Sequence, residues 1–376
     1  MSAVRRSNEV DIIRMAALIG ICVVNVPFMA LPVESVFTPP DGFYDKCAAF
    51  LVESFLQLKF FLLFSFVFGW GMAIQSKSLA SKGQSFTKRY FRRMAGLAFL
   101  GVIHAILVFS GDILLLYALL GMFLWLIKDF SPQKLLRFAA WMLPLSMVFL
   151  TLLAIVIDDT MADKSISITA TEGMQLGDGF FEATQTRLTD WPITFGFLVL
   201  LQGPLVLGAF AAGLAAAKTD FFSENSVGFN LLQRRLPLLI IIALPLNFLY
   251  AAVVGGIVPK TYEILPLLGF VLIAIGAPAL SLIYLYIFIR LSRMIKMPLL
   301  LVLAGQNSLS SYVAQGVLTG IVFGAYGLGL FNSLGHAALL PVSSIIALAA
   351  MVFVGAWVKL FGRGPLEPIL RRITGS

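Results

Sequence analysis

Two ionisable side chains in an apolar part of the chain could perform acid–base chemistry. His104 lies about two helical turns before the end of an apolar stretch, and Asp112 follows a Ser-Gly pair that predicts a tight turn. A neutral imidazole is a base near pH 7, and a carboxylate within reach would fix its tautomer and stabilise the imidazolium. The pair therefore suggests a general base with an orienting carboxylate. Asp112 also fits the N-cap of the next helix, and spacing leaves both roles open.

Lys59 is a third ionisable residue, near the middle of another apolar stretch. A charge at mid-bilayer costs roughly 2.5–3.5 kcal/mol on insertion scales, and snorkelling to water from there is implausible. We expect Lys59 to face the protein interior, with a carboxylate such as Glu53 or a helix-end carbonyl as its partner. Asn25 and Gln315 are polar residues in two further apolar stretches. We predict that Asn25, Lys59 and Gln315 line a substrate site or pore, although structural hydrogen bonding is the alternative for each.

Four basic residues form a dense cluster before the stretch that holds His104. They are Lys88, Arg89, Arg92 and Arg93. Anchoring to anionic lipid explains such a cluster by itself. The alternative is recognition of phosphate groups, as on coenzyme A, through charge-assisted hydrogen bonds. No glycine-rich phosphate loop accompanies the cluster.

The elements that must position these side chains are membrane helices. The chain of 376 residues is 59% hydrophobic and only 12% charged, about half the charge fraction of a soluble globule. Stretches long enough to cross a bilayer occur at 12–31, 48–74, 90–110, 112–128, 135–157, 191–217, 236–258, 263–289, 298–325 and 338–360. The sequence predicts an all-α polytopic bundle of about ten transmembrane helices, with residues 1–376 in a single membrane-embedded domain. Cys22 and Cys47 form no metal-binding or disulfide pattern, and no metal is expected.

The distribution of charge predicts the orientation. With a cytoplasmic N-terminus, 22 of the 27 Lys and Arg residues lie in or beside cytoplasmic segments, as the positive-inside rule requires. Residues 75–93 carry six basic residues and no acid, whereas residues 158–190 carry seven acids and two bases. Both termini are therefore expected in the cytoplasm. Residues 158–190 are predicted to form an extracytoplasmic loop, either a solvated connector or a lid over an outward-facing site.

Several motifs resemble those of the YeiB family of bacterial membrane proteins. The matching segments are DIIR at 11–14, GICVVN at 20–25, a Phe-rich element at 59–71, His104 with GDIL at 111–114 and YAL at 117–119, GQNSL at 305–309 with Tyr312 and Gln315, and GPLE at 364–367. The chain departs from the family pattern at Met15, Gln306 and Leu370, where the family usually has glycine, a basic residue and often an aromatic. The loss of the basic residue at 306 weakens any phosphate-binding role there.

The YeiB family is similar in overall plan to a wider group of transmembrane acyltransferases, including the lysosomal heparan glucosamine acetyltransferase and bacterial cell-surface O-acyltransferases. This resemblance implies that an acyl group passes from cytoplasmic acyl-CoA to an extracytoplasmic hydroxyl or amine, in a bacterial inner membrane. The general base would be His104 and its orienter Asp112, while the basic cluster would bind the donor phosphates.

Two rivals remain open, because fold analogy does not settle function. One is a permease for a small polar or anionic solute, with Lys59 as the binding charge. The other is a non-catalytic membrane subunit or lipid-binding scaffold. Expected partners are membrane lipids, acyl-CoA and the acceptor, and no nucleic acid. The sequence leaves the oligomeric state open, a homo-oligomer included.

Overall fold

The computed structural model describes residues 8–81, 83, 85–162, 179–223, 226–258 and 264–375. Within these residues the chain forms helices and no strands. The helices are α1 (Asn8–Ala30), α2 (Val33–Phe37), α3 (Phe43–Phe55), α4 (Lys59–Ala80), α5 (Phe86–Leu107), α6 (Leu114–Leu126), α7 (Pro132–Ala162), α8 (Phe180–Lys218), α9 (Val227–Val254), α10 (Ile264–Met294), α11 (Leu299–Gln306), α12 (Ser308–Phe323), α13 (His336–Phe361) and α14 (Glu367–Thr374).

The helices confirm a polytopic membrane bundle. Eight segments of the described chain are long and apolar enough to cross a bilayer, with α3 and α4 together counted as one of them. The shorter apolar helices α6 and α12 occupy two further predicted stretches. Every stretch predicted from the sequence is therefore helical, and two of them are each made of two helices, α3 with α4 and α11 with α12.

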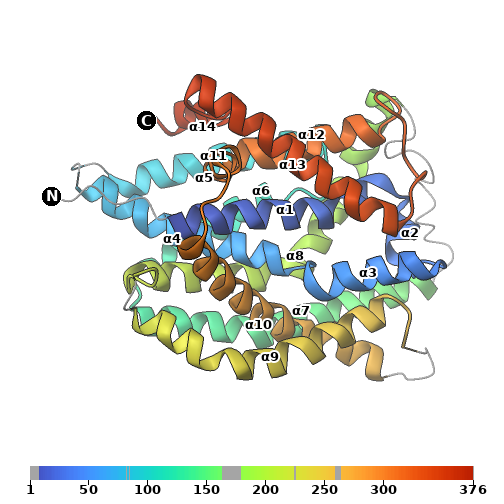
Figure 1. The fold of residues 1–376 in the computed structure, drawn as a ribbon, viewed down its shortest axis with the longest axis horizontal. Helices are drawn as coiled ribbons and strands as arrows, with labels where there is room; N and C mark the ends of the chain where they lie inside the picture. Colours follow the sequence, from blue (N-terminus) through green and yellow to red (C-terminus); the bar gives the residue numbers. More distant parts are fainter. Residues whose placement is uncertain are drawn as a thin grey trace.

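The long helices lie side by side along one axis (Figure 1). The start of α1 and the whole of α14 lie at one end of this bundle, and α2 lies at the other. Helix α1 packs against α4, α12 and α13, and α5 packs against α6. The start of the first described helix and the last described helix thus lie at the same end of the bundle. An even number of crossings requires this arrangement.

Close backbone contact joins α4 to α8. A Cβ atom at Gly69 would overlap the carbonyl group of Phe210, and one at Gly213 would overlap that of Phe66. The rings of Phe68 and Phe210 stack beside this contact, with centroids 4.6 Å apart. Small residues permit such close packing where the surrounding lipid provides no hydrophobic drive for association.

The predicted outer loop at 158–190 is shorter than expected. Helix α7 continues to Ala162, and α8 begins at Phe180 rather than near residue 191. Hydropathy detects only the part of a helix that lies in lipid, whereas α8 extends further through polar residues such as Glu182 and Thr184. Residues 163–178, and therefore Lys164 and any lid formed by this part of the chain, lie outside the described residues.

Candidate functional site

His104 and Asp112 form a buried hydrogen-bonded pair. The imidazole Nδ1 lies 2.9 Å from Asp112 Oδ1, and only 3% of His104 and 1% of Asp112 is exposed. The chain reverses between α5 and α6, because Val108 N and Phe109 N both donate to the carbonyl of His104 and end α5 there. Asp112 is thereby returned to the side of the imidazole.

Each carboxylate oxygen of Asp112 has a different partner. While Oδ1 faces the imidazole, Oδ2 accepts a hydrogen bond of 2.8 Å from Leu114 N, at the start of α6. Asp112 therefore contacts the imidazole and the first backbone N–H of α6 at once, while Ile113 occupies the N-cap position itself. Gly101 allows this arrangement, since a Cβ there would lie 2.6 Å from Leu115 N and 3.0 Å from Asp112 Oδ2.

The imidazole presents its second nitrogen to a small pocket that is lined by both polar and apolar residues. An ionised Asp112 accepts from Nδ1–H, which leaves the lone pair on Nε2. This Nε2 is buried and has no hydrogen-bond partner among the described residues, and the same holds for Gln315 Oε1. A buried acceptor without a partner at the edge of a pocket is suited to a ligand that donates a hydrogen bond.

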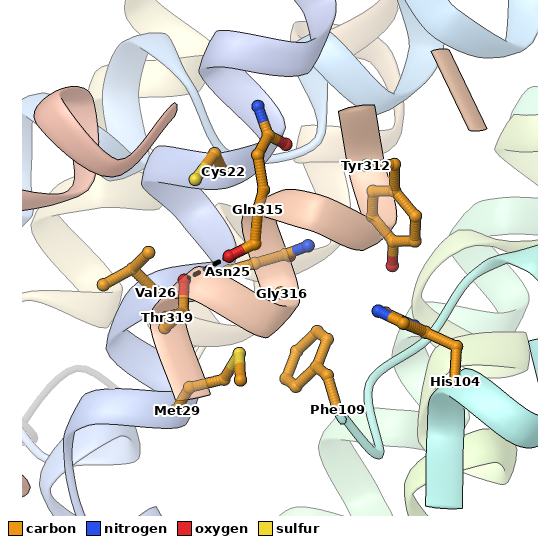
Figure 2. Close-up of a pocket in the computed structure, with 10 residues that line it drawn as sticks. All are labelled: Cys22, Asn25, Val26, Met29, His104, Phe109, Tyr312, Gln315, Gly316 and Thr319. Atoms are coloured by element: carbon orange, nitrogen blue, oxygen red, sulfur yellow. Dashed lines mark hydrogen bonds between the residues drawn. The ribbon is translucent and has the colours of Figure 1, made fainter. Parts of the chain in front are cut away.

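Figure 2 shows this pocket between α1, α5 and α12. Its lining residues are Cys22, Asn25, Val26, Met29, His104, Phe109, Tyr312, Gln315, Gly316 and Thr319. The free space inside the pocket admits about one water molecule. The pocket as it stands can hold a hydroxyl or amino group, and a larger substrate requires α1, α5 and α12 to separate.

Tyr312 is a pocket residue that the sequence did not single out for chemistry. Its ring centroid lies 5.2 Å from that of His104, and Figure 2 shows its hydroxyl directed toward the imidazole. The hydroxyl approaches Asp112 but completes no hydrogen bond of normal geometry within the described part of the chain. Tyr312 is three residues before Gln315, so both point to one side of α12, and this spacing could have identified it.

Asn25 and Gln315 both line this pocket. Gln315 Nε2 donates to Leu18 O at 3.2 Å, which joins α12 to α1, and Thr319 Oγ1 donates to Gln315 O at 2.8 Å. The sequence predicted that Lys59 would lie with these two residues. Lys59, however, does not line this pocket.

Lys59 instead binds the end of the preceding helix. Its Nζ donates to Glu53 O at 2.7 Å, near the C-terminus of α3, and lies 5.8 Å from the Tyr250 ring. Leu58, at the break between α3 and α4, has a φ of 68°. The expected helix-end carbonyl is therefore the partner, and Lys59, which is fully buried, closes the break between α3 and α4.

The basic cluster lies at the opposite end of α5 from His104. The twelve residues from Arg92 to His104 span about 18 Å of helix. Lys88 and Arg92 are exposed, whereas Arg89 is half-buried. Arg93 turns inward, with its guanidinium 5.7 Å from the centre of the Phe68 ring. The structure therefore separates two candidate parts, a basic surface at one end and an acid–base pair near the other.

The arrangement can take a proton from a hydroxyl or amine held in the pocket. Nε2 would accept the proton, and the buried carboxylate of Asp112 would stabilise the resulting imidazolium. Among the described residues, no group of three His, Cys, Asp or Glu side chains could hold a metal ion. The site's chemistry rests on the His104–Asp112 pair.

Comparison with known proteins supports the resemblance to the YeiB family. Residues 216–376 match a family described as "Protein of unknown function (DUF418)". Over 98% of its length, the chain is 27% identical to the uncharacterized protein YxaH of Bacillus subtilis (strain 168), of which 94% is covered. It is 26% identical, also over 98% of its length, to the uncharacterized protein YeiB of Escherichia coli (strain K12), of which 96% is covered. No solved structure matches the chain.

Proposed function

We propose that this protein is a membrane acyltransferase that moves an acyl group from cytoplasmic acyl-CoA to a hydroxyl or amine outside the membrane. The observation that supports it best is the buried His104–Asp112 pair, whose free Nε2 opens on a pocket with room for one small polar group. We further propose the bacterial inner membrane as its location, since the acidic segment would face out and the basic cluster in.

The proposed reaction balances with these groups alone. Nε2 of His104 removes the proton of the acceptor, and the acceptor oxygen or nitrogen attacks the thioester carbonyl carbon. The C–S bond breaks, the imidazolium returns its proton to the leaving thiolate, and the products are the acylated acceptor and free coenzyme A. Asp112 holds Nδ1–H throughout and remains ionised.

The donor would be held at the basic cluster, about 18 Å from His104 along α5. The phosphates of coenzyme A would bind Lys88, Arg89, Arg92 and Arg93, and the flexible pantetheine arm would carry the thioester between the helices. This requires the pocket to widen, because its present space accepts about one water molecule. Closed sites that open on donor binding also limit wasteful hydrolysis.

A permease that uses Lys59 as its solute-binding charge is less well supported. The Lys59 ammonium is buried, is bound to Glu53 O and lies outside the pocket that holds Asn25 and Gln315. A solute would have to displace an internal partner that closes a helix break.

The deciding experiment measures thiol release from acetyl-CoA by the purified protein, with a cell-envelope extract as the source of acceptor. We expect release above the spontaneous rate, and weaker coenzyme A binding at higher salt. The double variant Arg89→Ala, Arg92→Ala should bind the donor less tightly and lose much of this salt dependence. If the wild-type protein neither binds acetyl-CoA nor releases thiol, the proposal fails.

A further inference from the structure

Parts of three sequence motifs that take no part in the proposed chemistry meet at the end of the bundle opposite the outer loops. Asp11 belongs to the first, Gln306 to the second and Glu367 to the third, and they are far apart in the chain. Gln306 Nε2 donates to Asp11 Oδ2 at 2.7 Å, and Gly305 lies against the backbone of Asp11. The motifs therefore assemble one structure around the break between α11 and α12.

The C-terminal segment closes this break through a set of hydrogen bonds. Ser310 N donates to Glu367 Oε1 at 3.1 Å, and Ser310 Oγ donates to Glu367 Oε2. Leu366 N donates to Ser310 Oγ at 2.9 Å, and Gly364 N donates to Asn307 Oδ1 at 3.0 Å. Glu367 thus supplies a carboxylate to the first turn of α12, where backbone N–H groups lack helical partners.

Helix α12 also carries one wall of the pocket. Gly316 lies six residues after Ser310, about 9 Å along the helix. A Cβ at Gly316 would lie 2.8 Å from His104 Nε2, so α12 contacts the imidazole without any spare space. A small shift of α12 along its axis would therefore change the geometry around Nε2.

We infer that Glu367 is a positioning residue for the His104 pocket, which it holds in place by fixing the N-terminus of α12. The inference deepens the proposed function, on which it rests for the importance of this pocket. It also assigns a role to the C-terminal segment. Since α14 packs on α5, with Arg92 near Gly375, a donor bound at the basic cluster would contact the same segment that holds α12.

Cys22 provides a reporter that requires no turnover. It is buried in the pocket wall opposite α12, and the Cys47→Ser variant leaves it as the only thiol. In detergent solution, Glu367→Ala should raise the rate of Cys22 labelling by N-ethylmaleimide about tenfold to a hundredfold, the value of a lost hydrogen bond to a charged group. Glu367→Gln keeps one acceptor and should give a smaller increase.

Further variants separate this role from general loosening. Ser310→Ala should reproduce the effect and add little to Glu367→Ala, because both remove the same contact. Glu34→Ala removes an exposed carboxylate from the first turn of α2 and should leave Cys22 labelling unchanged. A second reporter is the thiol introduced by Ser146→Cys at a buried site on α7, in a background without Cys22 and Cys47.

The inference holds if Cys22 labelling rises while the α7 reporter stays slow. It is overturned if Cys22 labelling is unchanged in Glu367→Gln and Glu367→Ala, or if both reporters accelerate equally. Should Glu367→Ala fail to fold, Glu367→Gln decides alone. Labelling uses no acyl donor, so its outcome is independent of whether acetyl-CoA is ever consumed.

Discussion

At the residue scale, the candidate chemistry depends on how one carboxylate is shared. Asp112 fixes the imidazole with one oxygen and the start of α6 with the other. The proton-accepting nitrogen and the helix geometry are therefore set by the same side chain. Substitutions that remove the charge, the base or the cap separately can distinguish these contributions.

Replacing the base gives the first prediction. His104→Ala should lower acyl transfer by roughly 10²–10⁴, the usual contribution of a positioned general base, while coenzyme A binding is unchanged because the donor cluster lies elsewhere. Thiol release and donor binding are measured on the same preparation. His336→Ala changes the other histidine, which starts α13 away from the pocket, and should have little effect. Equal losses in both variants would contradict a specific role for His104.

Replacing Asp112, the carboxylate that would orient His104, gives the second prediction. Asp112→Asn keeps an oxygen that can cap α6, where Asn and Asp are about equally good, but removes the charge that stabilises imidazolium. Activity should fall while the thermal midpoint in detergent changes little. A lowered midpoint with normal specific activity would show that Asp112 acts only as a cap.

At the element scale, two of the predicted membrane stretches are broken helices, and polar side chains close each break. The break between α3 and α4 is closed from within by Lys59, and the break between α11 and α12 is closed by the C-terminal segment. Backbone groups freed at a break inside the bundle must find such partners, because lipid offers none.

The third prediction concerns the first break. Lys59→Leu should destabilise the protein strongly, by about 3–5 kcal/mol, because it removes the donor to Glu53 O and leaves the Glu53 carboxyl group, with which the ammonium also interacts electrostatically, buried without a cation. Lys46→Leu changes an exposed lysine on α3, before the break, and should be tolerated. The measurement is the thermal midpoint of unfolding in detergent. The double variant Lys59→Leu, Glu53→Leu should recover part of the loss, and equal tolerance of both single variants would mean that Lys59 reaches water.

The fourth prediction concerns the packing of α12 on α5. Gly316→Ala should abolish the proposed acyl transfer with the His104–Asp112 pair intact, because the added methyl group would lie 2.8 Å from Nε2 and take the acceptor's place. Gly196→Ala on α8 adds the same methyl group where nothing lies within 4 Å, and should be neutral. Acyl transfer is assayed in both. Normal activity in Gly316→Ala would place the chemistry away from this pocket.

At the scale of the whole molecule, the two candidate parts lie toward opposite ends of one bundle. The basic cluster begins α5 and His104 is near its far end. Such a separation suits a reaction whose donor and acceptor lie on different sides of a membrane, provided that the orientation is the one that the charges indicate.

Orientation is the fifth prediction. Reporters fused after Lys77, Lys218 and Arg363 should be cytoplasmic, and a reporter inserted between residues 163 and 178 should be external. Alkaline phosphatase and green fluorescent protein fusions report the two sides. One reversed reporter would break the arrangement of ten crossings with both termini inside.

The sequence by itself determined the helical class, the approximate positions of the apolar helices and the candidate base. These follow from composition, from the length of apolar stretches and from the rarity of ionisable residues in lipid, all of which are local properties of the chain. It did not determine that Asp112 serves His104 and α6 together, that Tyr312 faces the imidazole, or that Lys59 lies away from Asn25 and Gln315. Those relations depend on the turn between α5 and α6 and on which helix faces meet, and only the packing of distant segments decides them.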